Sequence, residues 1–155
     1  MPVSVGSKAP DFTLPDQDLK PVKLSEALRA HNVVLAFFPA AFTSVCTKEL
    51  CTFRDSMVRL NGARATVFGI SVDTPFTLKK FGAEQQLNFP LLSDFNKDVI
   101  RGYDVVIDDL LGLKGLAKRA VFVIDQAGVV RHAEVLADAR NEPDYAKVDA
   151  ALASL

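Results

Sequence analysis

The two cysteines of this chain, Cys46 and Cys51, follow an apolar segment and stand five residues apart. Residues 33–38 are apolar at every position, the pattern of a strand covered on both faces, and Pro39 ends the segment. Cys46 then falls in the first turn of the following helix, where free backbone N–H groups and the positive end of the helix dipole favour a thiolate. Cys46 is therefore a candidate nucleophile; the alternative is a small hydrophobic side chain packed in the core with Leu50.

The second thiol is too distant for a static disulfide as long as the helix is intact. Five residues along an α-helix turn a side chain by about 140° and advance it by about 7.5 Å, which separates the two Cα atoms by about 8.6 Å. Disulfides rarely join Cα atoms more than about 7 Å apart. A Cys46–Cys51 bridge would require the first turns of the helix to unwind, so the spacing predicts a transient bridge coupled to local opening.

Alternating strands and helices are expected to position the first thiol. Residues 46, 50, 53, 57 and 60 recur at steps of four and three, which places them on one face of a helix over residues 43–60. Strands are expected at residues 33–38, 66–72, 89–93, 120–125 and 128–135, with an edge hairpin formed by residues 11–16 and 21–24. Further helices are expected at residues 73–87, 97–103 and 143–155, whereas Gly112 and Gly115 indicate a loop or broken helix over 105–118. This pattern predicts an α/β sandwich around a mixed sheet, in one domain over residues 1–155.

The composition excludes several classes of protein. The chain has 155 residues, a formal net charge of −1 and no cluster of Lys and Arg, so we expect no nucleic-acid or membrane-surface partner. It has no apolar run of the roughly 20 residues that a membrane helix needs, and its start lacks the pattern of a secretory signal. Two thiols and two scattered histidines, His31 and His132, do not supply four organised metal ligands. We therefore expect a cytoplasmic protein without a metal site.

The segment Pro39-Ala-Ala-Phe-Thr43-Ser-Val-Cys46 resembles the P-x-x-x-[TS]-x-x-C active-site signature of the peroxiredoxins. Further matches occur in family order at residues 9–14, 68–73, 89–94 and 119–125. The C-x-x-x-x-C spacing resembles the peroxiredoxin Q group, also called bacterioferritin comigratory protein, and Phe37-Phe-Pro-Ala-Ala-Phe-Thr is similar to the one-cysteine alkyl hydroperoxide reductase E group. The resemblance implies a thioredoxin-like fold, a mixed central sheet flanked by helices with an N-terminal hairpin extension, and the reduction of hydroperoxides.

The resemblance also implies roles for single residues near the first thiol. Cys46 matches the peroxidatic cysteine, whose thiolate attacks a peroxide oxygen and becomes a sulfenic acid. Thr43 matches the hydroxyl that hydrogen-bonds the peroxide, although it could also serve as the helix N-cap. Pro39 matches the residue that shields the thiolate from water, although ending the strand would by itself explain a proline there.

A cation and a carboxylate complete the implied site. Arg119 matches an arginine that stabilises the thiolate and the polarised peroxide; an antiparallel pairing of residues 120–125 with 33–38 would bring it close to Cys46. Glu49 fits a position that often orients the arginine, and the alternative for Glu49 is an exposed carboxylate on the helix surface.

The resemblance assigns Cys51 as the thiol that condenses with the sulfenic acid. Thioredoxin or a glutaredoxin would then reduce the disulfide, and the chemistry requires no metal or flavin cofactor. One alternative is a one-cysteine enzyme in which Cys51 only packs. A thiol–disulfide oxidoreductase normally uses C-x-x-C, which is absent here, and a non-catalytic binding or redox-sensing protein remains a third class. The oligomeric state is open between monomer and homodimer, because Phe42, Phe76 and Phe95 could line either a core or a dimer surface.

Overall fold

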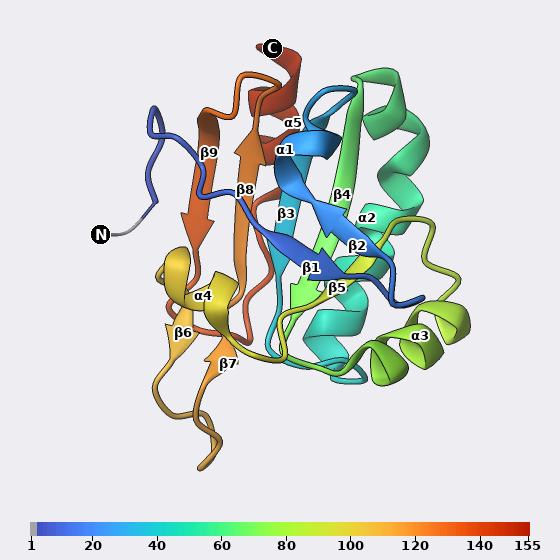
Figure 1. The fold of residues 1–155 in the computed structure, drawn as a ribbon, viewed down its shortest axis with the longest axis vertical. Helices are drawn as coiled ribbons and strands as arrows, with labels where there is room; N and C mark the ends of the chain where they lie inside the picture. Colours follow the sequence, from blue (N-terminus) through green and yellow to red (C-terminus); the bar gives the residue numbers. More distant parts are fainter. Residues whose placement is uncertain (1–2) are drawn as a thin grey trace.

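A five-stranded mixed sheet forms the centre of the protein, whose computed structural model describes residues 3–155 (Figure 1). The strands lie in the order β5-β4-β3-β8-β9. Their bounds are β3 Asn32–Phe37, β4 Ala65–Ser71, β5 Leu91–Ser93, β8 Ala120–Ile124 and β9 Val130–Val135. β3, β4 and β5 run parallel, whereas β8 runs antiparallel to both β3 and β9. The predicted α/β fold with a mixed sheet is confirmed.

Helices and a hairpin cover both faces of this sheet. One face packs against β1 (Thr13–Pro15), β2 (Pro21–Lys23), α1 (Leu24–Ala27) and α4 (Asp98–Gly102). The other face packs against α2 (Ser44–Gly62), α3 (Pro75–Glu84) and α5 (Tyr145–Ala153). Figure 1 shows β1, β2 and α4 in front of the sheet, with α2 behind it.

Double coverage explains why the central strands are apolar at every position. In β3, Val33 and Leu35 belong to the core between the sheet and the β1–β2 hairpin, while Val34 and Ala36 belong to the core between the sheet and α2. Successive side chains of a strand point to opposite faces, so a strand buried on both sides needs apolar residues throughout.

The helix after β3 forms where the periodicity predicts it. The five residues that recur at steps of four and three are all buried on its inner face: Cys46, Leu50, Phe53, Met57 and Leu60. Thr43 occupies the N-cap position, and the helix runs two residues beyond the predicted end at residue 60. The thiol of Cys46 therefore lies at the junction between the sheet and its longest covering helix.

Several local features differ from the prediction, including the start of β5 at Leu91 rather than residue 89 and the bounds of α5, Tyr145–Ala153 rather than 143–155. α3 ends at Glu84 rather than residue 87, because Gln86 adopts a left-handed φ of 52° that ends the helical turn. The short helix α1 was not predicted. Residues 105–118 form neither a loop alone nor a broken helix, but contain a two-stranded hairpin.

This hairpin consists of β6 (Val106–Ile107) and β7 (Leu116–Ala117), and its tip is closed by two hydrogen bonds. The N–H groups of Leu110 and Leu113 donate to each other's carbonyl oxygens at 2.8 and 2.9 Å. The hairpin extends past the end of the central sheet (Figure 1). Strands of only two residues are too short to show an alternation of apolar and polar side chains, so the sequence pattern did not reveal them. Among the helices in residues 3–155, none has the length and apolar character needed to cross a membrane.

Candidate active site

Cys46 lies in the first turn of α2, and its side chain is buried. Only 1% of the surface of Cys46 is exposed to solvent. The first hydrogen bond of the helical ladder runs from the Thr47 N–H to the Thr43 carbonyl at 2.9 Å, so the N–H groups of the three preceding residues lie ahead of that ladder. These groups give the helix terminus its partial positive charge, which favours a thiolate at Cys46.

The loop that leads into this helix is anchored by Asp73, at the end of β4. One carboxylate oxygen of Asp73 accepts hydrogen bonds from the Ala41 N–H at 2.8 Å and the Ser71 hydroxyl at 2.7 Å. Phe42 adopts a left-handed φ of 67°, and its ring lies 5.1 Å from that of Phe81 on α3. Asp73 was not among the predicted site residues; its position directly after a buried strand was the available signal.

The antiparallel pairing of β8 with β3 brings Arg119 to Cys46. Phe37 pairs with Ala120, so Arg119 lies beside the end of β3. The Arg119 Nη2 atom lies 3.1 Å from the Cys46 Sγ atom. Nε and Nη2 also donate to the Ala139 carbonyl at 3.1 and 3.0 Å, which fixes the plane of the guanidinium. The contribution of this backbone carbonyl could not be predicted, because it does not depend on the residue type at position 139.

Glu49 contacts the same guanidinium from one turn further along α2. Its Oε1 atom accepts from Arg119 Nη1 at 3.2 Å, and Glu49 is fully buried, so the alternative of an exposed helix carboxylate is wrong. Burial raises the pKa of the Glu49 carboxyl to about 8, although the charge and hydrogen bond of Arg119 act in the opposite direction. The second oxygen, Oε2, is buried and has no hydrogen-bond partner among residues 3–155. One guanidinium thus contacts two acidic groups, Cys46 and Glu49, and all three side chains are buried.

Thr43 and Pro39 belong to the segment that joins β3 to α2. The Thr43 hydroxyl donates to the Ala40 carbonyl at 2.8 Å and makes no side-chain capping bond, so the suggested N-cap role applies to its position but not to its hydroxyl. Because the hydroxyl proton is engaged, the oxygen lone pairs are left to accept a hydrogen bond. Pro39 is buried and follows the last residues of β3.

A cavity of about 260 Å³ contains the thiol and these neighbouring groups. Pro39, Thr43, Cys46 and Arg119 all line it. Its remaining wall comes largely from the β6–β7 hairpin through four leucines: Leu110, Leu111, Leu113 and Leu116. The four leucines were not among the predicted site residues, although their clustering within the seven residues 110–116 was a visible signal.

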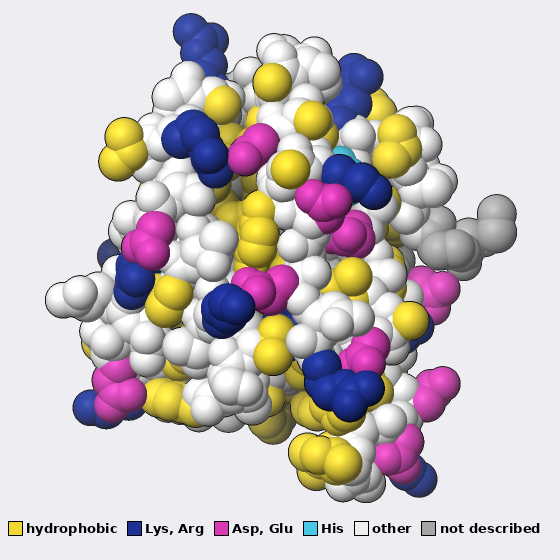
Figure 2. All heavy atoms as spheres, turned by 180° about the vertical axis from the view of Figure 1, so that it is seen from behind, with side chains coloured by type: hydrophobic (Ala, Val, Ile, Leu, Met, Phe, Trp, Pro, Cys, Tyr) yellow, Lys and Arg dark blue, Asp and Glu magenta, His cyan; other side chains and the backbone are white. Residues whose placement is uncertain are grey.

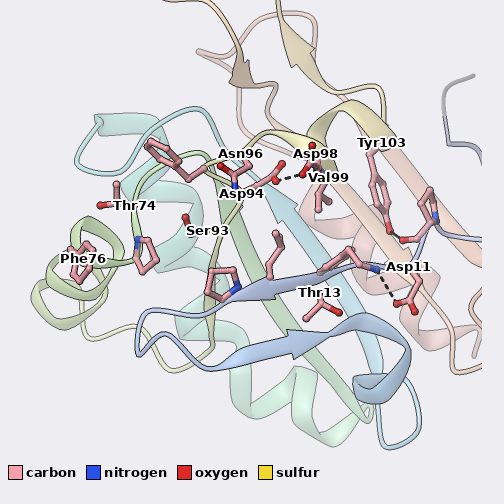
Figure 3. A pocket seen from close by; sticks show the side chains of 17 residues that line it. Asp11, Thr13, Thr74, Phe76, Ser93, Asp94, Asn96, Asp98, Val99 and Tyr103 are labelled. Carbon is pink, nitrogen blue, oxygen red and sulfur yellow. Dashed lines mark hydrogen bonds between the residues drawn. The ribbon is translucent and has the colours of Figure 1, made fainter.

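A larger cavity of about 590 Å³ lies on the opposite face of the sheet, between the β1 strand and the starts of α3 and α4 (Figure 3). Two of its polar side chains, Asp94 and Tyr103, are engaged in the fold. Asp94 accepts from the N–H groups of Val99 and Ile100 at 3.2 and 2.7 Å, and the Tyr103 hydroxyl donates to the Pro10 carbonyl at 2.7 Å. It contains no thiol or arginine, so the smaller cavity is the stronger candidate for chemistry.

Cys51 lies apart from the Cys46 cavity. It is half-buried, both cysteines are free thiols, and α2 is continuous between them. The Cys51 Sγ atom lies 3.5 Å from Gln85 Oε1, at the end of α3. The structure therefore brings Pro39, Thr43, Cys46, Glu49 and Arg119 together and leaves Cys51 outside this group.

Comparison with known proteins identifies the family of the chain. The profile of the AhpC/TSA family matches residues 5–133. Alkyl hydroperoxide reductase E of Mycobacterium tuberculosis is 39% identical over 135 residues, which cover 86% of each chain. The chloroplastic 2-cysteine peroxiredoxin of Chattonella marina var. antiqua is 37% identical over 145 residues, covering 87% of this chain and 72% of that protein. The chain spans 52% of the length of 2-Cys peroxiredoxin BAS1 of Spinacia oleracea.

Solved structures show the same fold. Peroxidoxin BcpB from Mycobacterium tuberculosis superposes with a TM-score of 0.85 at 38% identity, covering 98% of this chain and 96% of that one. A peroxiredoxin-like protein from Aquifex aeolicus gives a TM-score of 0.89 at 28% identity, covering 99% and 88%. The chain therefore belongs to the AhpC/TSA family, the peroxiredoxins, and is an oxidoreductase of the peroxidase class.

Proposed function

We propose that this protein reduces hydrogen peroxide and organic hydroperoxides with Cys46 as the attacking thiolate and Cys51 as the resolving thiol. The observation that carries the proposal is the 3.1 Å contact between Arg119 Nη2 and Cys46 Sγ inside a cavity. A fixed cation beside a buried sulfur stabilises the thiolate, and it also stabilises negative charge that develops as an O–O bond breaks.

In the first step the Cys46 sulfur attacks one peroxide oxygen, and the O–O bond breaks. The sulfur is oxidised to a sulfenic acid, and the second oxygen takes up a proton and leaves as an alcohol, or as water when the substrate is hydrogen peroxide. The free lone pairs of the Thr43 oxygen suit it to accept the hydroxyl hydrogen of the peroxide. Buried Pro39 keeps bulk water from the sulfur.

Glu49 acts as a positioning residue for Arg119 in this proposal. Its contact at 3.2 Å, together with the Ala139 carbonyl, holds the guanidinium in one orientation. A second ionised acid beside a single guanidinium would leave excess negative charge in a buried site. The raised pKa of Glu49 therefore favours a neutral carboxyl when the Cys46 thiolate forms.

In the second step the Cys51 sulfur attacks the Cys46 sulfenic acid; the S–S bond forms as the S–O bond breaks, and the leaving hydroxide takes up the proton given up by the Cys51 thiol and is released as one water. Because the intact α2 keeps the thiols apart, its first turns must open before this step. A dithiol protein such as thioredoxin or a glutaredoxin then reduces the disulfide by exchange. A cytoplasmic location would provide such reductants.

The test compares wild type with Cys46→Ser and Cys51→Ser in hydrogen peroxide consumption supported by thioredoxin. We expect both variants to lose turnover, and Cys51→Ser to retain a single rapid oxidation of Cys46. Loss of that first oxidation only in Cys46→Ser assigns the attacking thiol. Wild type that consumes no hydroperoxide would refute the proposal.

A one-cysteine mechanism is the second candidate, and the position of Cys51 favours it. Its sulfur faces Gln85 on another side of α2, outside the Cys46 cavity. Intact mass after one equivalent of peroxide separates the two mechanisms. A loss of two hydrogens indicates the internal disulfide, whereas a persistent gain of one oxygen indicates an unresolved sulfenic acid.

A further inference from the structure

We propose that Asp73 is a positioning residue for the reduction of peroxides, because its carboxylate fixes the peptide group against which the Thr43 hydroxyl is held. This inference rests on the proposed function, in which the Thr43 oxygen accepts a hydrogen bond from the peroxide. Asp73 lies outside the lining of the Cys46 cavity, so it acts on the reaction through the loop that joins β3 to α2.

A single peptide group connects the Asp73 carboxylate to the Thr43 hydroxyl. The carbonyl of Ala40 and the N–H of Ala41 belong to this group, which is planar and trans, so the two bonds point in opposite directions. The N–H donates to the Asp73 Oδ2 atom at 2.8 Å, and the carbonyl accepts the Thr43 hydroxyl at 2.8 Å. Because the group is rigid, the contact at one end sets the direction of the contact at the other.

The charge of the carboxylate strengthens this chain of hydrogen bonds. A backbone N–H that donates to an ionised acceptor forms a shorter and stronger bond than one that donates to a neutral acceptor. Such a bond polarises the peptide group and makes its carbonyl a better acceptor. The Thr43 proton is therefore held toward Ala40, and the oxygen lone pairs remain free at the wall of the cavity, of which Thr43 is part.

Two serines at the ends of neighbouring strands hold Asp73 in place. The Ser71 hydroxyl, at the end of β4, donates to Asp73 Oδ2 at 2.7 Å, and its oxygen accepts the Asp73 N–H at 3.2 Å. The Ser93 hydroxyl, at the end of β5, donates to the Asp73 carbonyl at 2.6 Å. Both serines are buried. The carboxylate that fixes the loop is thus itself fixed to the central sheet.

Helix capping does not account for an acidic residue at position 73. The N-cap of α3 is Thr74, whose hydroxyl accepts the Thr77 N–H at 3.3 Å. The loop does require an anchor, because Phe42 adopts a left-handed φ of 67°, which is disfavoured for residues with a Cβ atom. Such backbone persists where surrounding contacts hold it, and the two contacts of the preceding peptide group do so here.

The test compares two reactions of Cys46, oxidation by hydrogen peroxide and alkylation by iodoacetamide. Alkylation also requires the thiolate, but it releases iodide and needs no acceptor for a peroxide hydrogen, so it reports general damage to the site. After acid quench the remaining thiols are blocked with N-ethylmaleimide. Trypsin, which cuts at Lys48, then places Cys46 and Cys51 in separate peptides for mass spectrometry.

Asp11→Ala is the matched control. One carboxylate oxygen of Asp11 likewise accepts two hydrogen bonds, from the N–H groups of Phe12 and Ser25 at 2.9 and 3.0 Å. Asp11 belongs to the larger cavity on the opposite face of the sheet, so its loss should leave both reactions of Cys46 unchanged.

We expect Asp73→Ala to slow oxidation by about tenfold, through misplacement of a group that contacts the substrate, and to change alkylation by less than about twofold. Asp73→Asn should retain most of the oxidation rate, because its amide oxygen can still accept the Ala41 N–H. Asp73→Glu keeps the charge but displaces the oxygen by one methylene, so it should resemble Asp73→Ala. If Asp73→Ala failed to fold, the asparagine and glutamate variants would decide.

Loss of charge alone would give a different result. Basic and acidic side chains are interspersed over the α2 side of the molecule (Figure 2), so no single carboxylate dominates the field there. Hydrogen peroxide is uncharged, and removing a negative charge near a thiol favours its thiolate form. A purely electrostatic effect of Asp73→Ala would therefore speed both reactions instead of slowing one.

The effects of Asp73 and Thr43 should not add, because the first residue acts through the second. In a Thr43→Val background, Asp73→Ala should slow oxidation by less than about twofold further.

Three results would overturn the inference while leaving the proposed function intact. The first is an equal slowing of oxidation and alkylation in Asp73→Ala, and the second is an Asp73→Glu protein that oxidises as fast as Asp73→Asn. The third is a full tenfold loss from Asp73→Ala when Thr43 is already replaced by valine. Failure of wild type to oxidise Cys46 with any hydroperoxide would instead refute the proposed function, and this inference with it.

Discussion

The two thiols of α2 occupy opposite kinds of surroundings. Cys46 is 1% exposed and contacts a buried arginine, which is itself held by Glu49 and the Ala139 carbonyl. Cys51 is half-buried; its sulfur hydrogen-bonds the neutral side-chain oxygen of Gln85 at 3.5 Å and interacts electrostatically with the Arg54 guanidinium, which is partly exposed to solvent. The same helix therefore carries one sulfur that is hydrogen-bonded by a buried guanidinium and one that is hydrogen-bonded to an amide oxygen near the surface.

This difference teaches that the helix alone does not define the reactive thiol. The N-terminal turn of α2 favours a thiolate at Cys46. The cation that distinguishes this site, Arg119, directly precedes β8, the strand that pairs with β3. The two thiols also differ in the conformational change that the reaction of each one requires. In the proposed mechanism Cys46 reacts with a peroxide in place, whereas a bridge to Cys51 requires the helix to open. The following predictions test this contrast.

Removing the cation should have the largest effect. In Arg119→Met the fixed donor is lost, and we expect Cys46 oxidation by hydrogen peroxide to slow by about 10²- to 10³-fold. Arg119→Lys should retain part of the rate, since it keeps the charge but not the fork of donors. Arg131→Met on β9 is the control and should be unchanged. Alkylation of Cys51 should proceed equally in all variants. An Arg119→Met protein with the full rate of Cys46 oxidation would contradict the claim that the cation activates this thiol.

Glu49 should make stability depend on pH in a defined direction. Its pKa is raised from 4.5 to about 8 in the folded protein, so between these values only the folded state binds the proton. The free energy of unfolding should therefore fall as pH rises through this window. Relative to Glu49→Gln, wild type should lose on the order of a few kcal/mol between pH 5 and pH 8, measured by urea denaturation under reducing conditions. If the free energy of unfolding changed with pH in the same way in wild type and in Glu49→Gln, the raised pKa of Glu49 would be contradicted.

Weakening the helix between the thiols should accelerate disulfide formation. Lys48 is exposed and forms an ion pair with Glu142 at 3.0 Å, which both Lys48→Gly and Lys48→Ala remove. Glycine is less favourable than alanine in a helix by about 1 kcal/mol, so the glycine variant should bridge about fivefold faster after oxidation. Mass spectrometry of quenched samples follows the bridge. Equal rates in the two variants would mean that helix opening does not limit the step.

The smallest effect should come from the contacts that hold the Cys51 side of α2. Arg54 Nη1 donates to the Gln85 carbonyl at 2.6 Å, which ties α2 to the end of α3. Arg54→Met should lower the free energy of unfolding by about 1 kcal/mol, the usual net value of one hydrogen bond, and leave Cys46 oxidation unchanged. A slower Cys46 oxidation in this variant would show that the two thiol environments are coupled.

Much of the fold could be predicted because local patterns and tertiary packing agree. The apolar runs of β3 and β8 and the period of α2 each indicate their own burial, and the order of elements implies the sheet. The β6–β7 hairpin could not be predicted, since its strands are two residues long and its turn has leucine where asparagine is usual. The burial of Glu49 was likewise hidden, because it depends on an arginine 70 residues away in the chain.

The register between β3 and β8 has a consequence for folding. Arg119 reaches Cys46 across a sequence separation of 73 residues, and only when Phe37 pairs with Ala120. A folding chain with α2 formed but β8 unpaired would carry the thiol without its cation. Contacts between distant segments form slowly because the intervening chain must first be ordered. The return of peroxide consumption during refolding would therefore time the closure of the central sheet.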